Sequence, residues 1–152
     1  MIVRPASPAD AASIAEYNAA MALETEHTSL DRSRLRAGVE ALLADPAKGF
    51  YLVAESDGEV VGQLMITYEW SDWRNGTFWW IQSVYVAPAH RGRGVFKALY
   101  RRVEELASQN GGVCGLRLYV ERQNDRAKAV YEGLGMAATH YQMMEVDYTL
   151  SG

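Results

Sequence analysis

Cysteine is almost absent from this sequence of 152 residues, which contains only Cys114. A single thiol cannot form a disulfide within the chain, so a reducing cytoplasm is the expected compartment. The sequence shows no signal peptide, no lipidation motif and no apolar run long enough to span a membrane, so no membrane partner is expected. Basic residues are not in excess, because 15 Lys and Arg stand against 19 Asp and Glu. The formal net charge of −4 argues against general binding to nucleic acid.

The three histidines lack a spacing typical of metal ligands, and we expect no metal site. Hydrophobic residues make up 49% of the chain and charged residues 22%, a balance typical of a globular protein. The sequence contains no repeat, linker or low-complexity block. Its length therefore predicts one domain over residues 1–152, large enough for a hydrophobic core.

A glycine-containing loop, His90–Phe96, separates a strand-like run, Trp79–Val86, from an amphipathic helix. Gly92 and Gly94 allow main-chain N–H groups to approach a ligand closely. The start of the following helix adds N–H groups without helical partners and a partial positive charge. Together these features predict a site for an anion.

Two arginines, Arg91 and Arg93, add cationic side chains to this loop, which suits a pyrophosphate better than a single carboxylate. An ordinary strand-to-helix turn is the alternative interpretation. Two familiar phosphate motifs do not fit. The Lys-Ser/Thr pair of a P-loop is missing, and the third glycine of a Rossmann turn would fall on Lys97.

The N-terminal third predicts a strand over residues 1–4 followed by two helices. Ser7 is placed as the N-cap of the first helix and Asp10 as the acid of a capping box. The polar segment Glu24–Thr28 is expected to form a loop. Asp31 is placed to cap the second helix.

The middle of the chain changes to the two-residue period of strands. Residues 50–55 and 59–69 flank Asp57-Gly58, which is typical of a β-hairpin. A connection over 70–76 leads to a third strand at 77–86. We therefore expect an antiparallel meander before the glycine loop.

After the loop, apolar residues at helical spacing from Val95 to Leu106 predict a helix, and Leu116–Val120 predicts a strand. Asn124 is placed to cap a short helix. Two further strands are expected, at about 136–140 and 142–149. The complete order predicts an α+β fold with a mixed central sheet flanked by helices.

Two motifs in this order resemble those of the GNAT (GCN5-related) N-acetyltransferases. Arg91, Gly94 and Phe96 fall on the fixed positions of that family's Arg/Gln-x-x-Gly-x-Gly/Ala loop, with Phe96 in place of a small residue. The run Asn124–Met136 resembles the family's Asn-x-x-Ala-x-x-x-Tyr-x-x-x-Gly-Phe block. The resemblance covers nearly the whole chain and implies the GNAT fold, in which two parallel strands splay apart to receive the pantetheine arm.

The resemblance also implies acetyl-CoA as cosubstrate and an extended binding site for it. The main chain of the strand before the loop would hold the pantetheine, and the loop would hold the pyrophosphate. The implied cofactor-binding residues are Val84, Tyr85, Val86, Arg91, Gly92, Arg93, Gly94, Val95, Phe96, Asn124 and Tyr131.

The implied reaction is direct acyl transfer from a thioester to an amine in a ternary complex. By resemblance, Tyr131 is the acid that protonates the leaving thiolate. The strand before the loop, Trp79–Val86, holds no carboxylate, although many family members have a glutamate there. Glu69 is the nearest acidic candidate for the base, and a water relay is the alternative.

The acceptor is expected to be a small primary amine such as a polyamine or an amino acid. Tyr68–Trp73 alternates acids with aromatics, which suits a cation but equally suits a dimer contact. This arrangement loosely resembles the polyamine and diamine acetyltransferases, although Gln82 and Ser83 replace acidic residues of those enzymes. The candidate acceptor-binding residues are Glu24, Glu26, Glu69, Trp73, Gln82 and Ser83.

Two other functions remain open. The same fold could serve as a non-catalytic module that binds or senses acyl-CoA, or as an acetyltransferase of protein lysines or N-termini. A homodimer is a further expectation. A pocket walled by tryptophans favours a small acceptor, whereas a shallow groove favours a protein.

Overall fold

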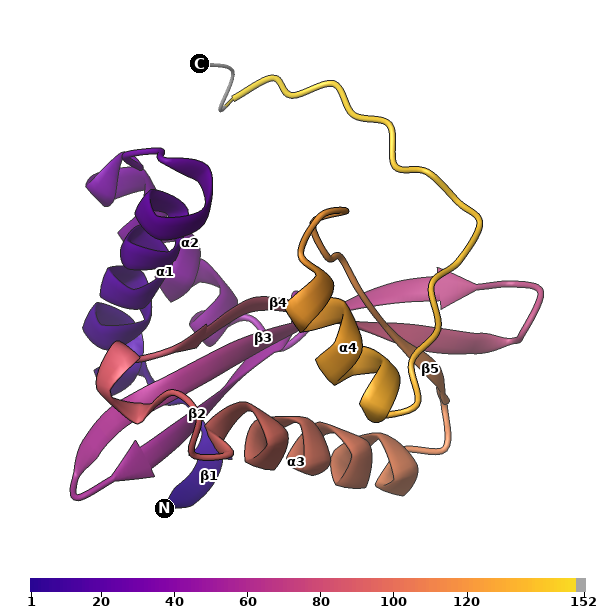
Figure 1. Ribbon diagram of the computed structural model, residues 1–152, viewed down its shortest axis with the longest axis horizontal. Helices are drawn as coiled ribbons and strands as arrows, with labels where there is room; N and C mark the ends of the chain where they lie inside the picture. The colour runs from indigo at the N-terminus through magenta and orange to yellow at the C-terminus, as the bar shows by residue number, and fades with distance from the viewer. Residues whose placement is uncertain (150–152) are drawn as a thin grey trace. The chain divides into compact units, whose positions relative to one another are not determined.

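A five-stranded sheet in the order β1-β2-β3-β4-β5 is the framework of the first part of the chain (Figure 1). The computed structural model describes residues 1–149 and divides the chain into two compact units, Met1–Tyr119 and Val120–Gly152. The first unit contains β1 (Ile2–Pro5), η1 (Pro8–Asp10), α1 (Ala11–Glu26), α2 (Arg32–Ala44), β2 (Phe50–Ser56), β3 (Glu59–Ser71), β4 (Gly76–Val86), η2 (Pro88–His90), α3 (Val95–Gln109) and β5 (Val113–Leu118). The second contains α4 (Asp125–Gly133).

The sheet is antiparallel from β1 to β4, and β5 joins β4 in parallel. The predicted hairpin and meander are confirmed, with β3 extending to Ser71. Pairing between β4 and β5 ends at Ile81 and Leu118. The remainder of β4, from Gln82 to Val86, therefore has β3 on one side and no strand on the other among the described residues. The α+β class with a mixed sheet is confirmed.

Helices cover both faces of this sheet (Figure 1). On one face α1 and α2 bury Ile14 and Val39 against Tyr51 and Val53 of β2. On the other face α3 approaches β3 so closely that a Cβ on Gly62 would lie 2.7 Å from a methyl carbon of Val95. The sheet is thus the middle layer, and its alternating side chains supply both halves of the core.

Short polar contacts set the helix starts in the first unit. The Asp10 carboxylate accepts a hydrogen bond from the Ser7 N–H at 2.8 Å, as a capping box requires. Asp31 Oδ1 accepts from the Arg34 N–H at 3.0 Å, which confirms the predicted cap of α2. The predicted loop at Glu24–Thr28 is wrong in its first half, because α1 continues through Glu26 and ends at left-handed His27. Residues 24–28 are exposed, so their polar side chains are compatible with a helix at the surface.

The second unit has one helix with the predicted cap. Asn124 Oδ1 accepts a hydrogen bond from the Ala127 N–H at 3.1 Å. The strands expected at 136–140 and 142–149 are not present, because no residue from 136 to 149 belongs to a helix or strand. The alternating pattern there is typical of a strand, but a strand forms only where its main chain finds a partner. Within residues 1–149 no helix has the length and apolarity needed to cross a bilayer.

Candidate functional site

The glycine loop leads into α3 through two left-handed residues. Gly92 has φ of 77° and Gly94, the N-cap of α3, has φ of 79°. Residues with a Cβ rarely adopt this conformation. An added Cβ would meet no atom within 4 Å at either position. Glycine is therefore needed here for backbone conformation, and the space beside the loop is open to a ligand.

The main-chain donors of this loop are not used by the protein. Hydrogen bonds from His90 N–H to Ala87 O at 2.8 Å and from Ala98 N–H to Gly94 O at 3.0 Å lie on either side of it. Within residues 1–149, no protein acceptor is recorded for the N–H groups of residues 92–95. A group of unpaired N–H donors at a helix start fits the oxygens of a phosphate or pyrophosphate.

The two loop arginines differ in their surroundings. Arg91 donates through Nε to Val86 O at 2.9 Å and through a terminal nitrogen to Glu24 Oε2 at 2.9 Å. Its guanidinium carbon also lies 5.2 Å from the ring centre of Tyr85. Arg93 is exposed, and in the described part of the chain no ion pair or hydrogen bond is recorded for it. Arg91 therefore holds the loop against β4 and α1, whereas the Arg93 charge is available to a ligand.

Glu24 joins the end of α1 to β4. Besides Arg91, its carboxylate accepts a hydrogen bond from the Tyr85 hydroxyl at 2.7 Å. The hydrogen bond from Tyr85, followed by that from Arg91, lowers the pKa of Glu24 below its ordinary value. Burial, followed by the hydrogen bond to Glu24, raises the pKa of Tyr85. The extra helical turn that sequence reasoning missed is what brings Glu24 to this position, while Glu26 stays exposed.

The strand β4 is irregular just where it separates from β5. Ser83 has φ of 52°, and the pairing between β3 and β4 shifts at this point. The Gln82 side-chain amide donates to Thr67 Oγ1 at 2.5 Å. The Gln63 side-chain amide donates to the Ser83 carbonyl at 3.1 Å. A β-bulge of this kind redirects main-chain groups and is common beside functional sites.

Most of the chain matches the model of one protein family. Residues 13–136 match the model of the acetyltransferase (GNAT) family. The chain belongs to the GNAT family. The matched residues include the glycine loop and the run Asn124–Met136, and β4 separates from β5 after Ile81.

Individual relatives agree with this family assignment. The chain is 34% identical over 115 residues to thialysine N-epsilon-acetyltransferase of Bos taurus, covering 67% of this chain and 66% of that protein. It is 31% identical to mycothiol acetyltransferase of Corynebacterium aurimucosum, covering 79% of this chain but 40% of that protein. The chain thus spans less than two thirds of these relatives. The crystal structure of a possible acetyltransferase from Clostridium difficile 630 is 45% identical, covers 96% of both chains and has a TM-score of 0.89.

Glu69 lies at a different part of this GNAT sheet. It is paired with Phe78, six residues before Val84 along β4, or roughly 20 Å away at about 3.3 Å per residue. Its Oε1 accepts from Trp80 Nε1 at 2.9 Å and from Arg117 at 2.8 Å. The Trp80 hydrogen bond, followed by the contact with Arg117, lowers the pKa of Glu69. The structure does not bring Glu69 to the bulge.

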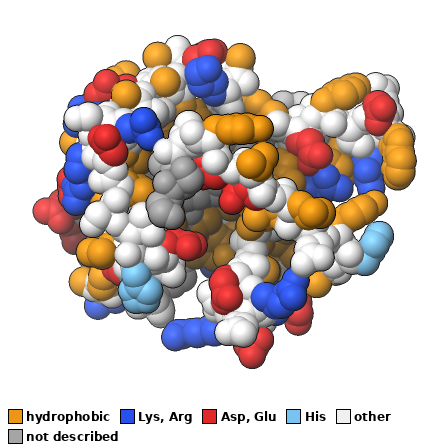
Figure 2. Space-filling view, turned by 90° about the horizontal axis from the view of Figure 1, so that it is seen from above, with side chains coloured by type: hydrophobic (Ala, Val, Ile, Leu, Met, Phe, Trp, Pro, Cys, Tyr) orange, Lys and Arg blue, Asp and Glu red, His pale blue; other side chains and the backbone are white. Residues whose placement is uncertain are grey.

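The aromatic segment around Trp73 is a surface feature. Trp73 lies in the turn between β3 and β4 and is 88% exposed, and Trp70 is 63% exposed. At the right-hand end of Figure 2, where Figure 1 places this turn, hydrophobic side chains lie beside acidic and basic ones. Trp73 is therefore not beside the residues of the bulge.

Tyr131 and Asn124 belong to the second unit. Tyr131 is half-buried on α4, and burial raises the pKa of its hydroxyl above the ordinary value. A phenol with a raised pKa remains protonated at neutral pH, as a proton donor must. Asn124 uses its Oδ1 for the cap of α4.

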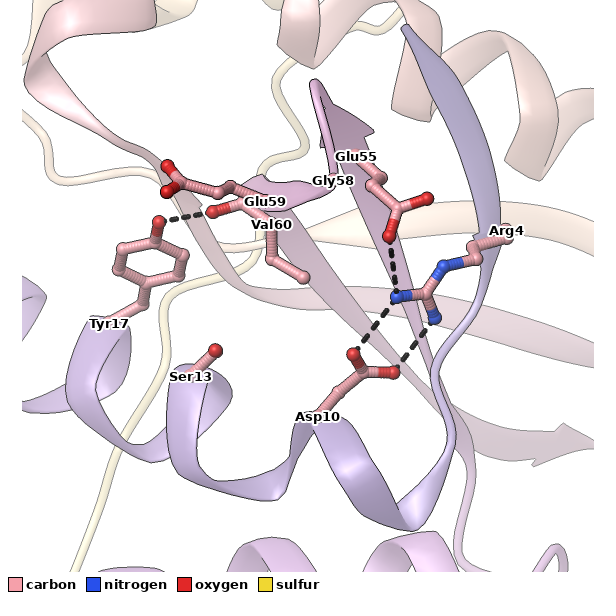
Figure 3. A pocket seen from close by; sticks show the side chains of 8 residues that line it. All are labelled: Arg4, Asp10, Ser13, Tyr17, Glu55, Gly58, Glu59 and Val60. Carbon is pink, nitrogen blue, oxygen red and sulfur yellow. Dashed lines mark hydrogen bonds and ion pairs between the residues drawn. The ribbon is translucent and has the colours of Figure 1, made fainter.

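A cavity of about 470 Å³ lies elsewhere in the first unit (Figure 3). Its walls come from β1, η1, α1 and the β2–β3 hairpin, with no residue from β4 or the glycine loop. The Arg4 guanidinium in it is paired with Asp10 at 2.8 Å and with Glu55 at 3.5 Å. This cavity is separate from the glycine loop, and Arg4, the single cation among its described lining residues, is already paired with two of its three carboxylates.

Proposed function

We propose that this chain transfers the acetyl group of acetyl-CoA to a primary amine of a small molecule. The observation that carries the proposal is the group of unpaired main-chain donors at residues 92–95. They follow the end of β4, where that strand is no longer paired with β5. The GNAT family uses acetyl-CoA as its cosubstrate, and the donors suit its pyrophosphate.

The proposed cofactor site follows the main chain from β4 into α3. The N–H groups of residues 92–95 and the Arg93 side chain would hold the pyrophosphate. The main chain of Val84–Val86 would pair with the amides of the pantetheine, because that stretch has no strand partner on its β5 side in the described chain. By family resemblance, Phe96, Asn124 and Tyr131 complete the set.

Acetyl-CoA supplies an acyl carbon activated as a thioester, so the reaction forms a C–N bond and breaks a C–S bond. The amine attacks only when neutral, because only then does its nitrogen carry a lone pair. The N–H of Val84, beside the bulge, would stabilise negative charge on the acyl oxygen. Tyr131 would give its hydroxyl proton to the leaving sulfur.

The amine proton needs a carrier. Glu69 on β3 lies opposite Phe78, too far along the sheet for direct contact with a group at Val84. We therefore favour a chain of water molecules over Glu69 as a direct base. Glu24, Glu26, Gln82 and Ser83 remain the proposed acceptor-side residues, and Glu24 brings a negative charge to β4 because it accepts a hydrogen bond from Tyr85.

The acceptor is proposed to be an amino-acid-like primary amine. The name of the bovine relative, thialysine N-epsilon-acetyltransferase, supports this class. Polyamines are the second choice, because Gln82 and Ser83 do not supply the acidic charge that a polyamine prefers.

Turnover of acetyl-CoA tests the proposal. The chain is mixed with acetyl-CoA and, one at a time, thialysine, lysine, spermidine and a lysine-containing peptide, and released thiol is measured. Thiol release that depends on a small amine supports the proposal. Saturable binding of acetyl-CoA without amine-dependent release favours a sensor, and release with the peptide alone favours a protein acetyltransferase.

We also propose a homodimer formed through residues 141–148. This stretch carries large hydrophobic side chains that are 62–92% exposed, at Tyr141, Met143, Met144, Val146 and Tyr148. Soluble monomers rarely expose so many together. Light scattering of the full chain should give twice the monomer mass, and the double substitution Met144→Glu with Val146→Glu should restore the monomer. A change from the dimer to the monomer mass with Trp73→Ala alone would favour the aromatic turn as the interface instead.

A further inference from the structure

Gln63 is a polar side chain in the centre of the sheet. It is 0% exposed, although the residues on either side of it in β3 are apolar. Its amide nitrogen donates to the Ser83 carbonyl at 3.1 Å. Its amide oxygen is buried, and among residues 1–149 it has no hydrogen-bond partner. Such a group is costly to bury, so a side chain chosen for packing alone would be apolar here.

The contact falls on the bulge. Gln63 is paired with Tyr85, and Met65 is paired with Gln82, so two steps along β3 correspond to three along β4. The extra residue is in the stretch that contains Ser83, whose φ is 52°. A non-glycine residue in this conformation persists only where its surroundings hold it. The hydrogen bond from Gln63 is a contact that holds this carbonyl.

The orientation of the next N–H follows from the planarity of the peptide. The Ser83 carbonyl and the Val84 N–H belong to one trans peptide and point in opposite directions. Because the carbonyl points at the Gln63 amide, the Val84 N–H points away from it. At this residue β4 has no partner on its β5 side in the described chain. The Val84 N–H therefore remains available to a ligand that lies along that side of the strand.

We propose that Gln63 is a positioning residue, which fixes the peptide between Ser83 and Val84 so that the Val84 N–H faces the acyl oxygen during transfer. This inference rests on the proposed acetyltransferase function. Gln63 touches neither substrate, and its effect on the reaction passes through the bulge. A side chain that only filled space in the core would have no such effect on the chemical step.

Replacement of the donor by an apolar side chain of similar size is the first test. Gln63→Met should keep the fold, because removal of the unpaired buried oxygen offsets part of the cost of leaving the Ser83 carbonyl without this donor. It should lower kcat about 10- to 100-fold, the order expected when one donor to the acyl oxygen is misplaced. The dissociation constant of acetyl-CoA should change less than about threefold, because the loop donors at residues 92–95 are untouched.

Asn18→Leu is the matched control. Asn18 is also a buried amide, 7% exposed, that donates to a main-chain carbonyl, here Ile14 O at 3.1 Å within α1. Its replacement should leave kcat unchanged. If Gln63→Met keeps kcat within twofold of the native value, or if both variants lose kcat alike, the positioning role is overturned.

The NMR signal of the Val84 amide decides the question without catalysis. In the native chain this N–H should exchange rapidly with solvent, since β5 pairing ends at Ile81 and leaves that side of β4 without a strand in the described chain. Gln63→Met should shift its signal, while Asn18→Leu should not. Protection of the Val84 N–H from exchange in the native chain would overturn the inference. This measurement needs only the native chain, so it applies even if Gln63→Met fails to fold. A native chain that does not bind acetyl-CoA would instead refute the proposed function, and the Val84 signal would still report on Gln63.

Discussion

The Tyr85 hydroxyl on β4 donates a hydrogen bond of 2.7 Å to the Glu24 carboxylate near the end of α1. The same carboxylate binds Arg91 at 2.9 Å, so one acidic side chain connects a helix, a strand and the glycine loop. Tyr85 also packs its ring 5.2 Å from that of Tyr17 on α1. This cluster fixes the end of β4, from which the loop departs.

The two loop arginines should respond differently to substitution. Arg93→Ala should weaken acetyl-CoA binding about tenfold at low salt and reduce the salt dependence of binding, because an exposed charge is removed from a phosphate site. Arg91→Ala should leave the salt dependence nearly unchanged, since Glu24 already balances that charge. Calorimetric titration at two salt concentrations measures both effects. If Arg91→Ala changes the salt dependence of binding more than Arg93→Ala does, then Arg91 is the arginine that binds the phosphate.

Gly94→Ala should destabilise the chain by about 1 kcal/mol, because alanine is strained at φ of 79°. It should also weaken acetyl-CoA binding, since a relaxed backbone moves the N–H donors. Gly38→Ala is the control. Gly38 lies inside α2 with no atom within 4 Å of an added Cβ, so its replacement should stabilise by about 0.5–1 kcal/mol. Thermal melts in which the melting temperature changes in the same direction for both variants would contradict the role given to Gly94.

Asp10 should make stability depend on acid pH. The hydrogen bond from Arg4 is the main cause that lowers the pKa of Asp10 below its ordinary value of 3.8. The folded chain thus binds the Asp10 proton more weakly than the unfolded chain, and the stabilisation is complete above pH 3.8 and is lost as the pH falls through the lower, folded pKa. Asp10→Asn should cost about 1–3 kcal/mol at pH 7 and progressively less below pH 4.

An exposed acid provides the control for Asp10. Glu40 pairs with Arg36 on the surface of α2, and Glu40→Gln should cost less than about 0.5 kcal/mol at either pH. Denaturant unfolding at pH 7 and pH 3 measures both variants. A constant loss for Asp10→Asn across this range would mean that the ion pair does not contribute.

Tyr131→Phe should lower kcat about 100-fold, the lower range for loss of a general acid. Acetyl-CoA affinity should stay within about threefold, because the ring remains. The raised pKa of Tyr131 keeps the native hydroxyl protonated until the pH exceeds the ordinary value of 10.0. Steady-state kinetics with separate binding measurements test this, and a large loss of affinity with unchanged kcat would make Tyr131 a packing residue.

Glu69→Gln should leave the pH profile of kcat/KM unchanged in shape. If Glu69 were the base, its lowered pKa would place the loss of rate below pH 4.5, where the carboxylate gains a proton. With a water relay no such limb depends on Glu69. A profile that loses its acid limb in the variant would restore Glu69 as the base.

Local sequence signals predicted the parts of the fold that depend on neighbouring residues. The cap of α2 by Asp31 and the cap of α4 by Asn124 follow from short side-chain contacts, and both are confirmed. Gly92 and Gly94 marked the loop because few other residues tolerate its backbone. The separation of β4 from β5 was predicted by family resemblance, and the strand pairing agrees with it.

Features that depend on tertiary contacts escaped prediction. The bulge at Ser83 contains no glycine that would have indicated it in the sequence. The Gln63 side chain that contacts it comes from another strand. The one feature of the sequence that could have indicated this contact was Gln63 itself, a polar residue inside the apolar run of β3. Glu24 was predicted to lie in a loop because its segment is polar. In the structure its carboxylate accepts hydrogen bonds from Tyr85 on β4 and from Arg91 in the glycine loop. The strands expected after residue 136 failed because alternation predicts a strand only when a partner exists.

Titration of the native chain with acetyl-CoA, followed through main-chain amide signals by NMR, tests the central claim most directly. Saturable shifts of the Gly92, Arg93, Gly94 and Val95 amides are the predicted result, because these N–H groups have no recorded acceptor in the described protein. The Val84 amide should shift as well, because β4 has no strand on its β5 side at that residue in the described chain. Binding that leaves those signals in place and moves others, or no saturable binding at all, would contradict it.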